Sequence, residues 1–240
     1  MKIKNKFFTL KYNSKSFPFK KIFENHLSGL NVKKLEKVHE QVPKKFVIKK
    51  KINSVKSDQK FPIYEFLYKI YENKKKVKKK LDFLIIYEEF IKFLSQKIFK
   101  ESLIYQKKPT LRIMFPKNRS VAQFHRDREY NHPIEEINVW VPVTEAKNSN
   151  TLWIESAFEK ADFRPVNLKY GEFLIFDSGL MHGNKINKEN KTRLSFDFRV
   201  IPLSIWKKRN IKMKIKASLD QKIKFDIGDY YNFLKYKKSK

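Results

Sequence analysis

Two stretches in the first 100 residues carry apolar side chains at intervals of three and four. The first runs from Ile63 to Tyr71 and the second from Phe83 to Ile98. This spacing places the apolar side chains on one face of an α-helix. Between the stretches lies KKKVKKK, Lys74–Lys80, whose like charges repel and favour an exposed connection. We therefore expect two amphipathic helices joined by a solvated link.

From about residue 102 the pattern changes to short runs rich in β-branched and aromatic residues. Turn residues separate the runs, as in Pro-Lys-Asn after Phe115 and Tyr-Gly at 170–171. Such runs predict strands, and eight of them in roughly 100 residues indicate an antiparallel sandwich or barrel. The runs are SLIYQ, TLRIMF, VAQFHRD, EINVWVPV, TLWIE, EFLIF, LMHGN and RLSFDFRVI.

The composition narrows the chemistry that the chain can perform. With 240 residues, 41% of them hydrophobic, it favours one domain with extensions over two full domains. The absence of cysteine excludes disulfides, zinc-thiolate sites and a cysteine nucleophile, so a metal would need histidine and carboxylate ligands. No apolar run reaches the roughly 18 residues of a membrane span, and the lysine-rich start lacks an apolar run of signal-peptide length. We expect a cytoplasmic protein with no membrane partner.

The net charge of +30 raises the question of a nucleic-acid partner. Residues 1–100 carry 27 basic and nine acidic side chains, whereas residues 101–200 carry 16 and 13. Of the 55 basic residues 47 are lysine, which fits a solvated surface better than a specific nucleic-acid site. Seven of the eight arginines lie between Arg112 and Arg199, and their two-pronged guanidinium groups suit a carboxylate or phosphate. We therefore expect no specific nucleic-acid partner.

Three residues of the β-rich region have the chemistry of a metal site. His125 and Asp127 are two apart in VAQFHRD, so in an extended strand both side chains leave the same face. His182 follows in LMHGN, at the end of another predicted strand. Two histidines and one carboxylate with open coordination positions are typical of non-haem Fe(II) oxygenases. A His-x-Asp triplet alone arises readily by chance, so the interpretation depends on the remaining pattern.

That pattern continues in the run RLSFDFRV. Arg193 and Ser195 share one strand face, and together they can hold a carboxylate by a two-pronged ion pair and a hydroxyl donor. Asp197 and Arg199 lie on the same face, opposite Leu194, Phe196 and Phe198.

With these residues assembled, the sequence resembles the Fe(II)- and 2-oxoglutarate-dependent oxygenases of the double-stranded β-helix, or jelly-roll, fold. It is most similar to the phytanoyl-CoA dioxygenase-like branch and, within it, to the small oxygenases of streptomycin-type biosynthetic clusters. The resemblance covers residues 102–202. The segments that carry it are HRDREYNHP, EINVWVPV, NTLWIES, YGEFLIFDSGLMHGN and TRLSFDFRVIP.

The resemblance implies a mainly β fold and a set of site residues. His125, Asp127 and His182 match the ligands of Fe(II), and Arg193, assisted by Ser195, matches the anchor of the cosubstrate 2-oxoglutarate. The resemblance also implies that O2 is a substrate and that 2-oxoglutarate is converted to succinate and CO2. In NTLWIES the sequence departs from the family, because Glu155 stands where Pro-Gly is expected.

This fold divides the chain into three parts of one structural domain. Residues 1–101 are expected to form a helical and extended layer that packs on the core, and residues 102–204 the jelly-roll catalytic core. Residues 205–240 would form a short basic C-terminal extension.

Several neighbouring side chains are candidates for ligand contacts. Asn138 and Trp140 share a strand face that lines the cavity if it points inward, where Asn138 could donate to 2-oxoglutarate; the opposite, outward orientation stays open. The remaining substrate-binding candidates are Arg199, Arg112, Gln106, Tyr130 and His132. For Arg199 the alternative is an ion pair with Asp197 or another acid, and for Tyr130 and His132 a plain polar loop. The acidic residues Glu135, Glu136, Glu155 and Asp177 are expected at the surface or in ion pairs.

The sequence thus predicts a dioxygenase that hydroxylates or otherwise oxidises a small polar metabolite with an anionic group. An oxygenase acting on a modified nucleobase is the first alternative, with the basic ends as an electrostatic platform. A jelly-roll binding module without catalysis is the second. The identity of the substrate and the oligomeric state stay open.

Overall fold

A computed structural model of the chain describes residues 3–47, 61–72, 82–119, 124–208 and 224–238. The lysine run Lys74–Lys80 lies outside these residues. The strands are β1 (Phe7–Lys11), β2 (Leu103–Gln106), β3 (Thr110–Met114), β4 (Ile137–Pro142), β5 (Leu152–Ile154), β6 (Arg164–Pro165), β7 (Glu172–Asp177), β8 (His182–Asn184), β9 (Arg193–Pro202) and β10 (Tyr231–Leu234). The α-helices are α1 (Phe19–Leu27), α2 (Val38–Gln41), α3 (Ile63–Tyr68), α4 (Phe83–Phe93) and α5 (Leu203–Trp206).

Short helical turns complete these elements. A π-helix, Leu94–Phe99, continues α4 without a break. The 3-10 turns are Ser28–Leu30, Leu35–Lys37, Lys44–Phe46, Lys69–Tyr71, Asp127–Tyr130 and Asn148–Asn150.

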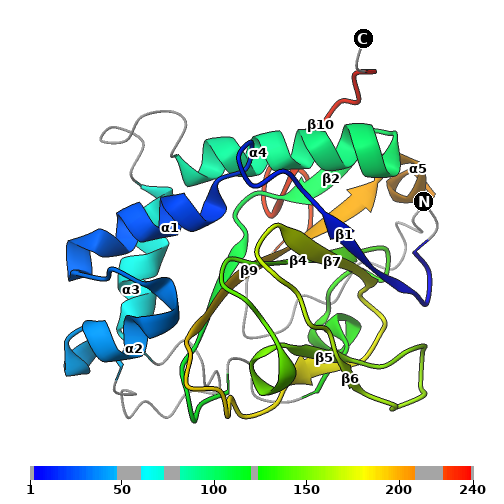
Figure 1. Ribbon diagram of the computed structural model, residues 1–240. Coiled ribbons are helices and arrows are strands. Elements are labelled where there is room, and N and C mark those ends of the chain that lie inside the picture. The colour runs from blue at the N-terminus through cyan, green and yellow to red at the C-terminus, as the bar shows by residue number, and fades with distance from the viewer. Residues whose placement is uncertain (1–2, 48–60, 73–81, 120–123, 209–223, 239–240) are drawn as a thin grey trace.

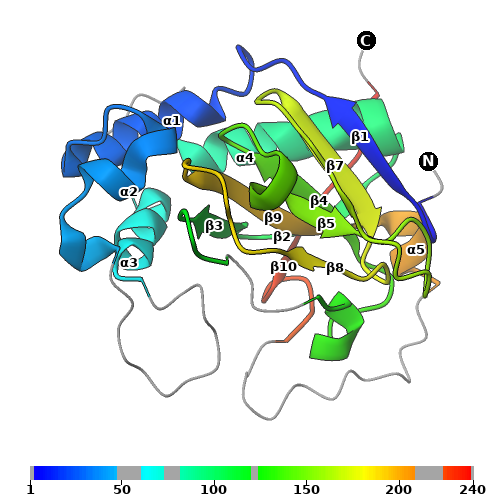
Figure 2. The same cartoon turned by 60° about the horizontal axis from the view of Figure 1, so that its bottom comes forward.

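The strands form two antiparallel sheets. The larger sheet has the order β1-β7-β4-β9-β2-β10, with β3 also paired to β9, and the smaller sheet has the order β6-β5-β8 (Figures 1 and 2). The neighbours β7, β4 and β9 are far apart in sequence, so long connections rather than hairpins place them side by side. This is the β-dominated double-stranded β-helix that the sequence predicts.

The long strand β9 shows how the sequence builds two different faces. Leu194, Phe196 and Phe198 are fully buried in the main hydrophobic core. Arg193 and Arg199 point to the opposite face, where they line a pocket between the two sheets. Because strand side chains alternate, one β-strand closes the core on one side and supplies charges on the other.

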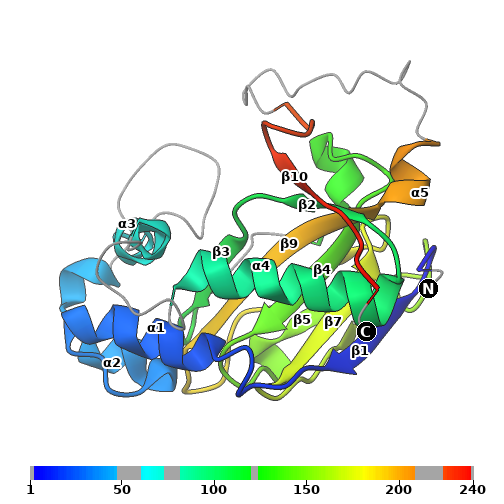
Figure 3. The same cartoon turned by 90° about the horizontal axis from the view of Figure 1, so that it is seen from above.

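Helices from the first 100 residues cover the core face of the larger sheet (Figure 3). Helix α4 begins at the N-cap Asp82, whose carboxylate accepts a hydrogen bond from the Ile85 N–H at 3.1 Å. Phe90 of α4 packs edge-on against Phe198 of β9, with ring centroids 6.3 Å apart. Ile63, at the start of α3, is fully buried. Both predicted amphipathic helices are confirmed, and their apolar stripes face the sheet or the helical layer.

Segments from both ends of the chain join the larger sheet. Strand β1 pairs with β7, and Tyr12, just after β1, donates its backbone N–H to the carbonyl of Gly171 at 2.8 Å. Gly171 has a φ of 97°, a left-handed conformation that glycine adopts without the steric cost of a side chain. At the other edge, β10 pairs with β2. Neither terminal strand, nor the two-residue β6, was among the predicted strands.

The predicted strand VAQFHRD is wrong in its described part. His125 makes an isolated bridge to His182, and Asp127 begins a 3-10 turn instead of continuing a strand. The turn is capped because the Glu129 carboxylate accepts the backbone N–H of Arg126 at 3.1 Å. Arg126 itself is extended, with φ −106° and ψ 138°, which is enough to place both neighbours on one side.

The described helices are all too short or too polar to cross a membrane.

Candidate metal centre

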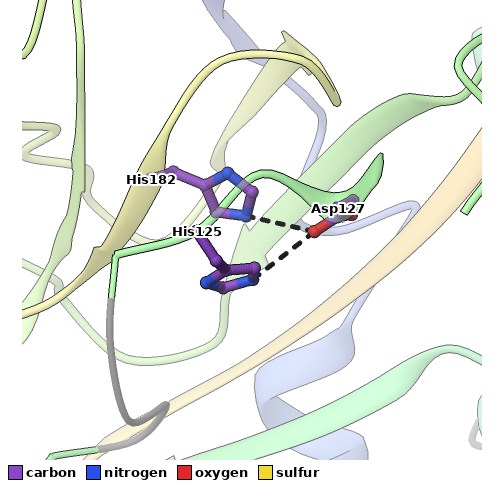
Figure 4. Close-up of side chains that lie close together, drawn as sticks. All are labelled: His125, Asp127 and His182. Carbon is purple, nitrogen blue, oxygen red and sulfur yellow. Dashed lines mark ion pairs between the residues drawn. The ribbon is translucent and has the colours of Figure 1, made fainter. Parts of the chain in front are cut away.

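His125, Asp127 and His182 meet at the edge of the smaller sheet (Figure 4). The Nε2 atoms of both histidines lie 3.5 Å from Oδ1 of Asp127. The two histidines are joined by backbone hydrogen bonds in both directions, at 2.9 and 3.0 Å. The bridge fixes the histidine pair, and the turn after Arg126 brings the carboxylate to it.

His182 presents a lone pair to this cluster. Its Nδ1 donates to the backbone carbonyl of Leu180 at 2.9 Å, so the neutral ring carries its proton on Nδ1 and leaves Nε2 free to bind a metal. Burial lowers the pKa of His182 to about 4, although the Asp127 carboxylate opposes this shift. The ring is therefore neutral at physiological pH, the form that ligates metals.

Asp127 is a buried carboxylate with fixed partners. Its Oδ2 accepts hydrogen bonds from Nε and Nη2 of Arg199, at 3.2 and 2.9 Å, and from Nδ2 of Asn138, at 2.9 Å. Burial raises the pKa of the carboxyl, but the charge of Arg199 and the hydrogen bond from His125 hold that pKa well below its usual range. Oδ2 is thus occupied by donors, while Oδ1 faces the histidines.

The donor set fits a divalent transition metal. Ligand atoms that are each about 2.1 Å from one ion lie roughly 3 to 3.4 Å apart, close to the 3.5 Å found here. Two imidazoles and one ionised carboxylate match the facial triad of non-haem Fe(II). The spacing and burial of the three residues therefore suit such an ion.

A second group with metal-ligating chemistry combines Asp127 with His132 and Glu136. In this group His132 Nδ1 donates to Glu136 Oε2 at 2.8 Å, and the hydroxyl of Tyr231 donates to Glu136 Oε1. Both oxygens of Glu136 therefore accept hydrogen bonds from protein donors. These hydrogen bonds account for the close approach of His132 and Glu136 without a metal ion.

A pocket between the sheets opens beside His125 and His182. Its wall comes from strands of both sheets, with polar side chains from β3, β4, β8 and β9 and apolar ones from β4, β5 and β7. The lining residues are Arg112, His125, Asn138, Trp140, Leu152, Phe176, His182, Gly183, Asn184, Arg193, Asp197 and Arg199. A ligand in this pocket would lie against the histidine pair and three guanidinium groups.

Arg193 lies in the pocket wall, as predicted, and is only 1% exposed. Its Nη1 donates to Oδ1 of Asn184 at 2.7 Å and to the carbonyl of Asn150 at 3.1 Å, and its guanidinium lies 5.4 Å from the Trp140 ring centroid. These contacts fix its orientation. Ser195 is fully buried on the same strand face, and among the described residues its hydroxyl has no hydrogen-bond partner.

Asn138 and Trp140 both point inward and line the pocket, so the inward orientation of this strand face is correct. The structure gives Asn138 a protein partner that the sequence did not predict, because its amide donates to Asp127. Asn138 is also predicted to donate to 2-oxoglutarate. It would have to do so with the same amide group that donates to Asp127.

Arg199 and Arg112 line the pocket but are engaged by carboxylates. Besides its bonds to Asp127, Arg199 donates from Nη1 to Asp197 Oδ2 at 2.7 Å. Arg112 donates from Nε to the other oxygen of Asp197 at 2.9 Å. The ion pair that the sequence left open for Arg199 is therefore present.

Three candidates for substrate contact lie outside the pocket lining. Gln106 is buried and donates to the carbonyl of Lys108 at 2.7 Å, so it fastens the β2–β3 turn. Tyr130 is 60% exposed and packs edge-on against His125, with centroids 5.3 Å apart. His132 packs on Phe225 at 4.8 Å, away from the pocket wall. The structure thus places these three residues beside other elements, and substrate contact by them stays a prediction.

Two acidic residues are more deeply buried than sequence position suggested. Glu136 is 1% exposed and Glu155 is fully buried. Glu155 pairs with Arg126 at 3.3 Å, so the ion-pair interpretation is correct for it and the surface interpretation is wrong.

Sequence reasoning missed Asn184, the partner of Arg193. It follows His182 by two residues in β8, so strand alternation would have placed both on one face. Leu152 and Phe176, which complete the apolar wall, carry no signal that separates them from ordinary core residues.

No family model matches the chain. A curated relative does: the streptomycin biosynthesis protein StrG of Streptomyces griseus is 35% identical over 133 residues, which make up 55% of this chain and 61% of the relative. The chain thus spans about three fifths of the length of that relative.

Solved structures share the fold at low sequence identity. A non-heme monooxygenase, ThoJ, in its nickel complex has a TM-score of 0.50 and 14% identity, over 82% of this chain and 74% of that chain. AviO1 from Streptomyces viridochromogenes Tue57 has a TM-score of 0.51 and 13% identity, over 84% of this chain and 92% of that chain. The chain therefore has the double-stranded β-helix fold of a non-heme monooxygenase and, as its motifs predicted, is similar in sequence to a streptomycin biosynthesis protein.

Proposed function

We propose that this protein is an Fe(II)- and 2-oxoglutarate-dependent dioxygenase that oxidises a small polar metabolite carrying an anionic group. The observation that carries the proposal is the His125–Asp127–His182 cluster, placed beside a pocket that also contains Arg193. The likenesses to a non-heme monooxygenase and to a streptomycin biosynthesis protein support the same reaction class and a small-molecule substrate.

The arginine at the pocket wall supports 2-oxoglutarate as cosubstrate. Arg193 is oriented by Asn184 and by the carbonyl of Asn150, so it is pre-organised before a ligand binds. Its guanidinium can form a charged pair with the distal carboxylate, and the buried hydroxyl of Ser195 can add a donor. Bound Fe(II) would supply the coupling of oxidative decarboxylation, which gives succinate and CO2, to oxidation of a substrate C–H bond.

The charge balance supports an anionic substrate. Arg112, Arg193 and Arg199 bring three positive charges to the pocket, and Asp127 and Asp197 bring two negative ones. The charges of a divalent ion and a dianionic cosubstrate cancel each other, so these arginine and aspartate side chains sum to one positive charge. A substrate with one anionic group would neutralise it.

The residues of the chain have distinct tasks in this reaction. His125, Asp127 and His182 would hold the ion, and the Leu180 carbonyl keeps the His182 lone pair directed at it. Arg199 and Asn138 keep Asp127 ionised and fix its second oxygen. Trp140, Leu152 and Phe176 form the apolar part of the wall and exclude water from the reacting carbon.

The test is formation of succinate from 2-oxoglutarate by the protein with Fe(II), O2 and ascorbate, in the presence of panels of anionic and neutral metabolites. We expect one class of anionic metabolite to stimulate succinate formation and to gain one oxygen atom or lose two hydrogen atoms. The Asp127→Ala protein should show neither result. Succinate formation that does not require Asp127, or its complete absence with every panel, would contradict the proposal.

A further inference from the structure

Arg126 lies between two residues of the metal cluster and points away from them. Its extended backbone sends its side chain to the side opposite His125 and Asp127. There Nε donates to the carbonyl of Gly179 at 3.1 Å, Nη2 lies 3.3 Å from Glu155 Oε1, and Nη1 lies 3.5 Å from Glu129 Oε1. The guanidinium also lies over the Phe158 ring, 4.9 Å from its centroid.

Glu155 joins this arginine to the segment that carries the third ligand. Its Oε1 accepts the backbone N–H of Met181, the residue before His182, at 2.6 Å. Its own backbone N–H donates to the Met181 carbonyl at 3.1 Å, and Oε2 accepts the N–H of Ala161 at 3.2 Å. A single fully buried carboxylate therefore contacts both ligand-bearing segments at once.

The Glu155–Arg126 pair adds to a small number of backbone hydrogen bonds between the two segments that carry the cluster. The segment of His125 and Asp127 is joined to the segment of His182 by one bridge and by the Asp127 N–H, which donates to the Ser178 carbonyl at 3.2 Å. A one-residue bridge supplies only two backbone hydrogen bonds between the segments, and the Glu155–Arg126 pair adds a contact on the opposite side. A buried charge is costly unless paired, so this pair also resists separation.

We propose that Glu155 is a positioning residue of the metal site, which acts through Arg126 and Met181 to hold His125, Asp127 and His182 at ligand spacing. The inference rests on the proposed metal site but concerns residues that do not touch the ion. Residues that orient metal ligands from outside change metal affinity by about 10- to 100-fold when they are replaced.

The experiment measures Co(II) binding to the metal-free full-length protein by titration of the visible Co(II) absorption. In Glu155→Gln the amide oxygen can still accept the Met181 N–H, but the charge that holds Arg126 is lost. We expect the Kd for Co(II) to rise at least tenfold and the absorption bands to change, because the ligand geometry loosens. Glu129→Gln is the matched control, since its amide oxygen can still accept the Arg126 backbone N–H that caps the turn, while an exposed carboxylate is removed from the same guanidinium. It should change the Kd less than threefold.

Arg126→Gln and the double variant test the route of the effect. If Glu155 acts through Arg126, each single variant and the double variant should weaken Co(II) binding by similar factors instead of multiplying. Arg126→Gln also replaces Glu155→Gln should the latter fail to fold, because Arg126 is less buried.

The outcomes separate the two proposals. If the wild-type protein binds no Co(II), or binds it as well after His182→Ala, the proposed metal site fails. If the wild type binds Co(II) through these ligands and Glu155→Gln or Arg126→Gln binds equally well, the positioning role is overturned. It is overturned as well if Glu155→Gln only lowers the unfolding midpoint of the metal-free protein, or if Glu129→Gln has the same effect on Kd.

Discussion

Replacing Arg199 by glutamine tests the charge network around Asp127, a residue of the proposed metal site. Arg199 makes two hydrogen bonds to Asp127 and one to Asp197, and it is 8% exposed. After the substitution Asp197 keeps Arg112 as a guanidinium partner. Asp127 keeps the amide of Asn138 and the rings of His125 and His182, but it loses the guanidinium that pairs with it. Asp127 is therefore the carboxylate that loses its compensating charge.

The expected loss of unfolding free energy in Arg199→Gln follows from this difference between Asp127 and Asp197. Removing one partner of a buried ion pair costs about 3 to 5 kcal/mol because the other charge stays buried. The amide of Asn138 still donates to Asp127, which places the expected loss of unfolding free energy near the lower end, about 3 kcal/mol. Such a loss is a large part of the stability of an ordinary domain, so the effect should be well resolved.

The assay is urea unfolding of the metal-free protein, arranged as a double-mutant cycle with Asp127→Asn. Once Asp127 is neutral, Arg199→Gln no longer leaves a carboxylate without its cation, so we expect a coupling energy of about 2 to 3 kcal/mol. Arg112→Gln is the matched control, because Arg112 pairs with Asp197, whereas Arg199 is the arginine that pairs with Asp127. Its coupling to Asp127→Asn should be below about 0.5 kcal/mol.

The pH dependence gives a second check with a defined sign. Arg199 holds the pKa of Asp127 below its unfolded value, so its contribution is present above that value and is lost as the pH falls through the folded pKa. Without Arg199 the carboxyl protonates earlier, and the stability gap between wild type and variant should narrow as the pH falls from 7 towards 4. A loss below about 1 kcal/mol at pH 7 with no coupling to Asp127 would refute the network and return Arg199 to the candidates for substrate contact.

Three further predictions concern the cluster, the anchor and a histidine in the helical layer. Replacing His125, Asp127 or His182 by alanine should abolish succinate formation and weaken metal binding. Because Asp127 would occupy the coordination position that a chloride ion needs, we expect no chlorinated product, and its detection by mass spectrometry would contradict the assignment. Arg193→Ala should raise the KM for 2-oxoglutarate at least tenfold, since a charged hydrogen bond contributes about 1.5 to 3 kcal/mol, and an unchanged KM would place the anchor elsewhere. Burial lowers the pKa of His26, so the unfolded state binds more protons below about pH 6.5 and stability should fall from pH 7 to 5; His26→Gln should make this slope in urea unfolding shallower, and an identical slope would argue against the shift.

The local pattern was sufficient to predict most elements of the core. Period-two alternation in RLSFDFRV placed Arg193 and Arg199 opposite Phe196 and Phe198, and β9 has this arrangement. The two helical stripes became the layer that covers the larger sheet. These predictions succeed because the side-chain period follows from backbone geometry and because burial of one face selects the register.

The predicted strand at His125 shows where local pattern misleads. His-Arg-Asp has the alternation of a strand, and His125 and Asp127 do reach one side, but a bridge and a capped turn produce that arrangement. The residue types and their spacing located the His125–Asp127–His182 cluster, although the secondary structure assigned to these residues was wrong.

The mainly β fold, the helical layer and the three residues of the His125–Asp127–His182 cluster follow from the sequence pattern alone. The partners of the buried charges became visible only in the folded chain: Arg199 for Asp127, Arg126 for Glu155, and the hydroxyl of Tyr231 for Glu136. These pairs join residues up to 95 positions apart, and β1 and β10 enter the sheet in the same way. No local pattern encodes such contacts, because the free energy of pairing a buried charge or a sheet edge depends on the partner that the completed fold brings to it.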